Sequence, residues 1–167
     1  AAVTINDADG VALNASDLSA IGAKTTGTVT VTNAVAISGN TSESTAALVT
    51  SGSLVEVSDA TVTLSDTPSI SALNAIAGKT TGVVTATLAA DSLSNLGSLT
   101  TAGTDAITIT VNDADAASVT AANLSTLGGK TSGTVTVTNA VAISGSRAEA
   151  TAALVTSGSL VEVSDAA

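Results

Sequence analysis

Apolar and polar residues alternate in six short segments along this chain of 167 residues. The segments are TVTVT (28–32), SLVEV (53–57), VVTAT (83–87), ITITV (107–111), TVTVT (134–138) and SLVEV (159–163). A period of two carried by Val, Ile and Thr predicts β-strands that each bury one face. The segments begin about 25 to 30 residues apart, which indicates a regularly repeated unit.

The stretches between these segments are rich in Ala and Leu, with apolar residues three or four positions apart. The clearest pairs are Leu18 and Ile21, Leu73 and Ile76, Leu93 and Leu96, and Leu124 and Leu127. This spacing predicts helices of one or two turns, each with a single apolar stripe.

Internal repetition dominates the sequence. TVTVTNAVAISG begins at 28 and again at 134, and TAALVTSGSLVEVSDA begins at 45 and again at 151, so both pairs are 106 residues apart. The middle is a weaker copy, in which VTLSD (62–66) resembles VTIND (3–7) and the loop before AGKTTG is about four residues shorter. We therefore predict a superrepeat over 1–106 and a partial copy over 107–167.

The predicted unit is a strand, a corner, a second short strand or loop, a short helix and a glycine turn. One such unit cannot bury its own apolar face, whereas several can if equivalent strands pair in parallel through crossovers of this length. The pattern predicts a mainly β solenoid, either a right-handed parallel β-helix-like fold or an α/β solenoid, with short helices in each rung of about 25 to 30 residues. Residues 1–167 would form one segment of about six rungs.

Composition limits the function. The chain has no His, Cys, Met, Phe, Trp or Tyr, and its formal net charge is −10. The missing side chains remove the usual general base, thiol and zinc ligands, so an enzyme is not expected. The acidic charge argues against nucleic acid as a partner, and no apolar run is long enough for membrane insertion. Divalent cations remain compatible partners.

Gly-Lys-Thr sequences at 78–80 and 129–131 resemble the end of a phosphate-binding loop. That loop needs a further glycine five positions earlier, where this chain has Leu73 and Leu124, and it needs a helix after the lysine. Here the predicted helix precedes Lys24, Lys79 and Lys130. We expect each lysine in the last helical turn, followed by a glycine with positive φ that turns the chain into the next strand.

The acidic corners are the candidate metal site. NDAD occurs at 6–9 and again at 112–115, so Asp7, Asp9, Asp113 and Asp115 are candidate calcium ligands. The alternative is that Asn and Asp are ordinary turn residues whose side chains bond nearby amides. Calcium is the only cofactor predicted.

Threonines on the polar faces of the strands suggest a further alternative, which is ice binding. Aligned Thr-x-Thr strands would form a flat array of hydroxyl groups like the face of an ice-binding protein. Thr is also simply the polar residue with the best β-propensity. Glu56 and Glu162 interrupt the array.

The stretch ITVNDADAASVTAANLSTLGGKTSGTVTVTN is similar to the long repeat arrays of giant bacterial cell-surface proteins, such as those of marine cyanobacteria and some proteobacteria. The resemblance covers the whole chain and rests on composition and repeat style. It implies an extracellular, structural or adhesive role, often with calcium, and it brings no catalytic residues.

These observations predict a structural repeat module of a large secreted or cell-surface protein. Its ends lack the polar caps that a free-standing solenoid needs and would leave open sheet edges, which predicts self-association end to end into a rod or filament. The alternative is a calcium-dependent adhesin or an ice-binding module that uses the Thr-x-Thr strands.

Overall fold

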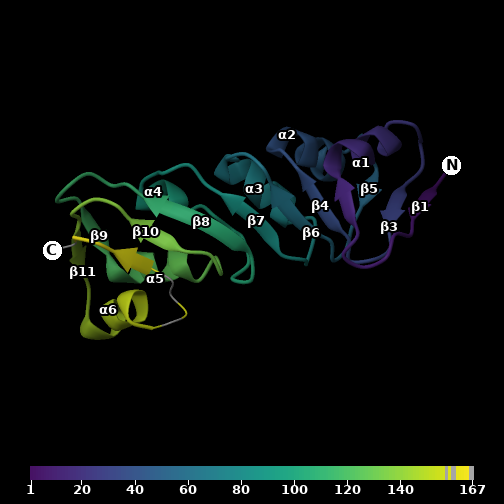
Figure 1. Cartoon of the computed structure of the whole chain (residues 1–167). Helices are drawn as coiled ribbons and strands as arrows, with labels where there is room; N and C mark the ends of the chain where they lie inside the picture. Colours follow the sequence, from purple (N-terminus) through teal and green to yellow (C-terminus); the bar gives the residue numbers. More distant parts are fainter. Residues whose placement is uncertain (157, 159–160, 166–167) are drawn as a thin grey trace. The chain divides into compact units, whose positions relative to one another are not determined.

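The computed structural model describes residues 1–156, 158 and 161–165, and it divides the chain into two compact units, Ala1–Ala86 and Thr87–Ala167 (Figure 1). Ser159 and Leu160 of the last predicted strand segment lie outside the described residues. We describe each unit separately and call them unit 1 and unit 2.

Unit 1 has two runs of parallel strands with helices between them. Strands follow one another in the orders β1-β3-β5 and β2-β4-β6-β7. In Figure 1, the helices α1, α2 and α3 run along one side of β4 and β6. The elements are β1 (Val3–Ile5), β2 (Ala12–Asn14), α1 (Ala15–Gly22), β3 (Val29–Val31), β4 (Ala36–Gly39), α2 (Thr41–Ser44), the π-helical turn η1 (Thr45–Val49), β5 (Val55–Glu56), β6 (Thr61–Leu64), α3 (Ile70–Ala77) and β7 (Val84–Thr87).

Unit 2 repeats this arrangement, with parallel orders β8-β10-β12 and β9-β11. Its elements are α4 (Leu93–Leu96), β8 (Ala106–Val111), β9 (Ser118–Thr120), α5 (Ala121–Gly128), β10 (Val135–Val137), β11 (Ala142–Ser144), α6 (Arg147–Leu154) and β12 (Val161–Val163).

The predicted strands and their parallel pairing are confirmed. Val3 pairs with Val29 and Val29 with Val55, while in unit 2 Ile109 pairs with Val135 and Val135 with Val161. Each step along these ladders covers 26 residues of sequence, in line with the spacing of the alternating segments. The valines of β3 and β10 are buried, so one face of each strand contributes to the core.

The predicted helices also exist, and most of their apolar stripes are buried. Leu73 and Ile76 of α3, and Leu124 and Leu127 of α5, are almost completely buried. Side chains set where several helices begin: the hydroxyls of Ser69, Ser92, Thr120 and Ser146 each accept a hydrogen bond from a backbone N–H three residues on.

The predicted solenoid is wrong. The chain has an α/β fold with parallel sheets that are not curled or closed into a solenoid. Strand β6 shows a physical reason, because its sequence VTLSD is the counterpart of VTIND in β1, yet it pairs with β4 in the ladder of β2. Only residues 65–69 separate β6 from α3, which leaves no room for a second strand. The β1-β3-β5 ladder therefore stops at β5, and copies in the sequence do not occupy equivalent strands.

Candidate binding surface

The first acidic corner, at residues 6–9, links β1 to the loop after β3. The side-chain amide of Asn33 donates to the Asp7 carbonyl oxygen at 2.6 Å, and the Asp9 carboxylate accepts from the Ala34 N–H at 3.1 Å. These bonds tie one strand–turn unit to the next.

The second acidic corner, at residues 112–115, repeats both bonds. The Asn139 amide donates to the Asp113 carbonyl oxygen at 2.7 Å, and the Asp115 carboxylate accepts from the Ala140 N–H at 3.2 Å. The same bonds in both copies match the turn-residue alternative, in which Asn and Asp bind local amides.

The structure places the candidate calcium ligands two to a corner, Asp7 with Asp9 in unit 1 and Asp113 with Asp115 in unit 2. Within the described part of the chain, no group of three or more Asp or Glu residues gathers where it could hold a metal ion. Calcium binding stays a prediction. A thermal melt with calcium and with a chelator checks it, because a cation bound only by the folded state raises the midpoint and an unchanged midpoint contradicts it.

The Gly-Lys-Thr turns differ from expectation in two details. Lys24, Lys79 and Lys130 follow the last turns of α1, α3 and α5 rather than lying within them. The following glycines do not need positive φ. A Cβ on Gly27 would lie 2.7 Å from the Ala1 and Ala2 backbone, and similar contacts exclude a side chain at Gly82 and Gly133. These turns need glycine because another backbone passes close to them.

The threonine of each turn has a role that the sequence did not reveal. The hydroxyls of Thr25, Thr80 and Thr131 each accept from the N–H of the glycine two residues on, at 2.8 to 3.0 Å. Each hydroxyl also contacts the backbone carbonyl of an earlier strand or loop, namely that of Ala1, Ala60 or Ile107. These turns join neighbouring backbone segments. The predicted order of helix, lysine and strand is confirmed at all three turns.

The threonine rows are short and end in glutamate. Thr4 lies opposite Thr30 and Thr30 opposite Glu56 in unit 1, and in unit 2 Thr110, Thr136 and Glu162 align in the same way. The interruption expected from the sequence is therefore confirmed. Ice binding stays a prediction that no observation of the fold favours.

An apolar depression at the N-terminal side of unit 1 is the strongest candidate binding surface. It has a volume of about 350 Å³ and lies between β1, β2 and α1. Ile5, Leu13, Leu18 and Ile21 form its apolar floor, and Ile21 is 38% exposed. Asn6, Asp7, Asn14 and Asp17 stand around it. We call this surface the open face.

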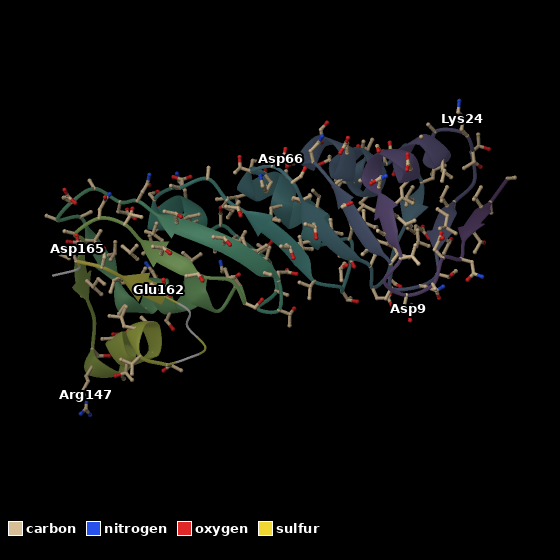
Figure 2. The ribbon with its side chains drawn as sticks, in the orientation of Figure 1. Asp9, Lys24, Asp66, Arg147, Glu162 and Asp165 are labelled. Carbon is tan, nitrogen blue, oxygen red and sulfur yellow. The ribbon has the colours of Figure 1, made fainter. Side chains whose placement is uncertain are left out.

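Asp7 and Asp17 are the charged residues that line the open face. Figure 2 shows Asp9 and Lys24 projecting from opposite sides of unit 1. Asp17 accepts a hydrogen bond from the side-chain amide of Asn14, which precedes α1. The apolar pair Leu18 and Ile21 was recognised in the sequence as a helix stripe. Leu18 is buried, whereas Ile21 is exposed, and the exposure of Ile21 could not be predicted because the pattern does not say what covers a stripe.

Comparison of the chain with family models, with curated proteins and with solved structures gave no match. The resemblance to giant cell-surface proteins therefore stays a prediction. Among the described residues, no helix combines the length and apolar character needed to cross a bilayer.

Proposed function

We propose that the chain is a structural repeat module of a large secreted or cell-surface protein, and that it associates end to end into a rod or filament. Nearly identical repeats and a core built from Ala, Val, Leu and Ile support a structural role. The extracellular location rests on the resemblance alone.

The observation that carries the proposal is the exposed edge of β1. This strand is last in its ladder, and its sequence Val-Thr-Ile contains no charge and no proline. Natural proteins usually protect such edges, because unpaired N–H and C=O groups can pair with another chain. The parallel ladder of unit 1 could therefore continue into a second copy.

Thr4 is the residue of β1 whose backbone faces this edge. The N–H of Val3 donates to Thr28 and the carbonyl of Ile5 accepts from Thr32, so these two residues turn their backbones toward β3. Because successive residues of a strand point their backbone groups in opposite directions, the N–H and C=O of Thr4 point outward.

The test is Thr4→Pro, with Thr4→Ser as the matched control. Proline removes the outward N–H and leaves the pairing with β3 in place, since proline is tolerated at strand edges. Sedimentation velocity and negative-stain microscopy of the full chain should show assemblies for the wild type and for Thr4→Ser, and fewer for Thr4→Pro. A wild-type chain that stays monomeric over the whole soluble concentration range would contradict the proposal.

A further inference from the structure

The open face has a counterpart in unit 2, because residues 1–27 and 107–133 are copies. In that copy the face is covered by residues 88–99 of the same unit. The Leu88 N–H donates to the Thr108 carbonyl at 3.0 Å, and the Asp91 N–H donates to the Thr110 carbonyl at 3.1 Å. Asp91 thereby forms a parallel bridge beside β8.

The covering segment continues as the one-turn helix α4, which lies against α5. The Leu93 N–H donates to the Asp113 carboxylate at 2.7 Å, and the Lys130 ammonium donates to the Gly97 carbonyl at 2.7 Å. These bonds hold the two ends of α4. Leu93 and Leu96 turn inward and are buried.

Each group of unit 2 that bonds to residues 88–99 has a counterpart in residues 1–27, 106 positions earlier in the sequence. Asp7 corresponds to Asp113 and Lys24 to Lys130, and the carbonyls of Ala2 and Thr4 correspond to those of Thr108 and Thr110. The apolar floor corresponds as well, since Leu13, Leu18 and Ile21 stand where unit 2 has Val119, Leu124 and Leu127.

We propose that the open face is a docking surface for a polypeptide segment with the chemistry of residues 88–99. The segment is a short extended stretch that pairs in parallel with β1, followed by a one-turn helix of the pattern Leu-x-x-Leu. Its leucines fill the depression, Asp7 accepts from its first helical N–H, and Lys24 donates to its last carbonyl. This deepens the proposed function, on which it rests, by naming the partner of this end of unit 1.

The test extends the full chain with a copy of residues 87–106 placed before Ala1. This reproduces the connection by which the segment reaches β8 in unit 2. The control extension carries Leu93→Asp and Leu96→Asp in the added copy. Hydrogen exchange of the Asn6 amide is the readout, because its equivalent in unit 2 donates to the Asp91 carbonyl at 3.0 Å.

We expect exchange at Asn6 to slow by about tenfold or more with the wild-type extension, and to be unchanged with the control extension. Exchange at Asn112, which is already covered, reports that unit 2 is unaltered. Equal exchange at Asn6 in the two extended chains would overturn the proposal.

Substitutions of Asp7 and Lys24 in unit 1 distinguish the proposed docking geometry from nonspecific apolar contact. In the extended chain, Asp7→Ala and Lys24→Ala should each restore part of the exchange at Asn6. Asp59→Ala, which removes an exposed carboxylate elsewhere in unit 1, is the matched control and should not. If the three variants show the same exchange at Asn6, the proposed hydrogen bonds of Asp7 and Lys24 to the docked segment are wrong.

Sedimentation of the unextended chain distinguishes this inference from the proposed function. Slowed exchange in the extended chain together with a monomeric unextended chain would support docking and contradict end-to-end assembly. Assembly of the unextended chain without any effect of the extension on exchange would contradict docking and place the contact elsewhere. If the chain assembles, and the wild-type extension blocks assembly whereas the control extension does not, then the open face takes part both in docking and in end-to-end assembly.

Discussion

Residues 1–27 and their copy 107–133 fold alike, but their helices are buried to different extents. Both contain a strand, an Asn-Asp corner, an eight-residue helix and a Lys-Thr turn. Ile21 of the first copy is 38% exposed, whereas Leu127 of the second is 1% exposed. The difference comes from the neighbour, because residues 88–99 lie over the second copy within unit 2. The motif therefore specifies its own fold, while its burial depends on the segment next to it.

The largest expected difference between the copies is in the apolar stripe of the helix. Leu127→Ala should lower the free energy of unfolding by about 2–5 kcal/mol, since it leaves a cavity in a packed core. Ile21→Ala should cost less than about 1 kcal/mol, because much of the side chain already contacts water. Urea unfolding followed by far-UV circular dichroism measures both, as the chain has no aromatic fluorophore. Equal losses would show that the two helices are equally covered in solution.

The next difference lies in the turn threonines. The buried Thr131 hydroxyl accepts from the Ile107 N–H at 2.8 Å and from the Gly133 N–H at 2.8 Å. Thr131→Val should cost about 1–3 kcal/mol, because it leaves buried backbone groups without their partner. Thr25→Val should cost less, since water reaches the half-buried Thr25 and can replace the lost bonds. The same urea unfolding measurement compares the two variants. A larger loss of unfolding free energy for Thr25→Val than for Thr131→Val would contradict this account.

A third difference lies beyond these two segments, between Ser44 at the end of α2 and Ala150 within α6, which are 106 positions apart. Ser44 is completely buried and its hydroxyl has no hydrogen-bond partner among the described residues, whereas Ala150 has no hydroxyl. Ser44→Ala should therefore stabilise the chain by about 1 kcal/mol, because it removes an unsatisfied buried hydroxyl. Ala150→Ser, at a half-buried position, is the matched reverse change and should have little effect. A destabilising Ser44→Ala would mean that this hydroxyl has a partner in solution.

Much of the local structure could be predicted from the sequence, because it depends on patterns within a few residues. Alternating Val and Thr predicted β3 and β10, and leucines three residues apart predicted α5. The spacing of the repeats also predicted parallel pairing, which the 26-residue register confirms.

The larger arrangement could not be predicted, because it depends on contacts between repeats. The shift of β6 into the ladder of β2 follows from the short connection at residues 65–69, which the resemblance of VTLSD to VTIND concealed. The open face was missed for a similar reason. Ile21 looks the same in the sequence whether or not a neighbour covers it.

The smallest expected effect concerns residues 88–99, the segment that covers the second copy and that we call the cover, and its stability at low pH. The Asn95 side chain and the Ser92 N–H donate to the Asp91 carboxylate and hold its pKa below the ordinary value of 3.8. A carboxyl group with a lowered pKa in the folded state stabilises that state above its unfolded pKa, and this contribution is lost as the pH falls through the folded value. Protection of the α4 amides against hydrogen exchange should therefore decrease below about pH 4.

Asp91→Asn removes this titration while keeping an acceptor oxygen for the same donors. Protection of α4 in this variant should depend less on pH than in the wild type. The Asp113 carboxylate also binds this helix, through the Leu93 N–H, so Asp113→Asn is measured beside it and should retain the contribution of Asp91. If Asp91→Asn keeps the full acid dependence, another group controls the cover. If it flattens the dependence, acid is a means of uncovering the second copy until it resembles the open face of the first.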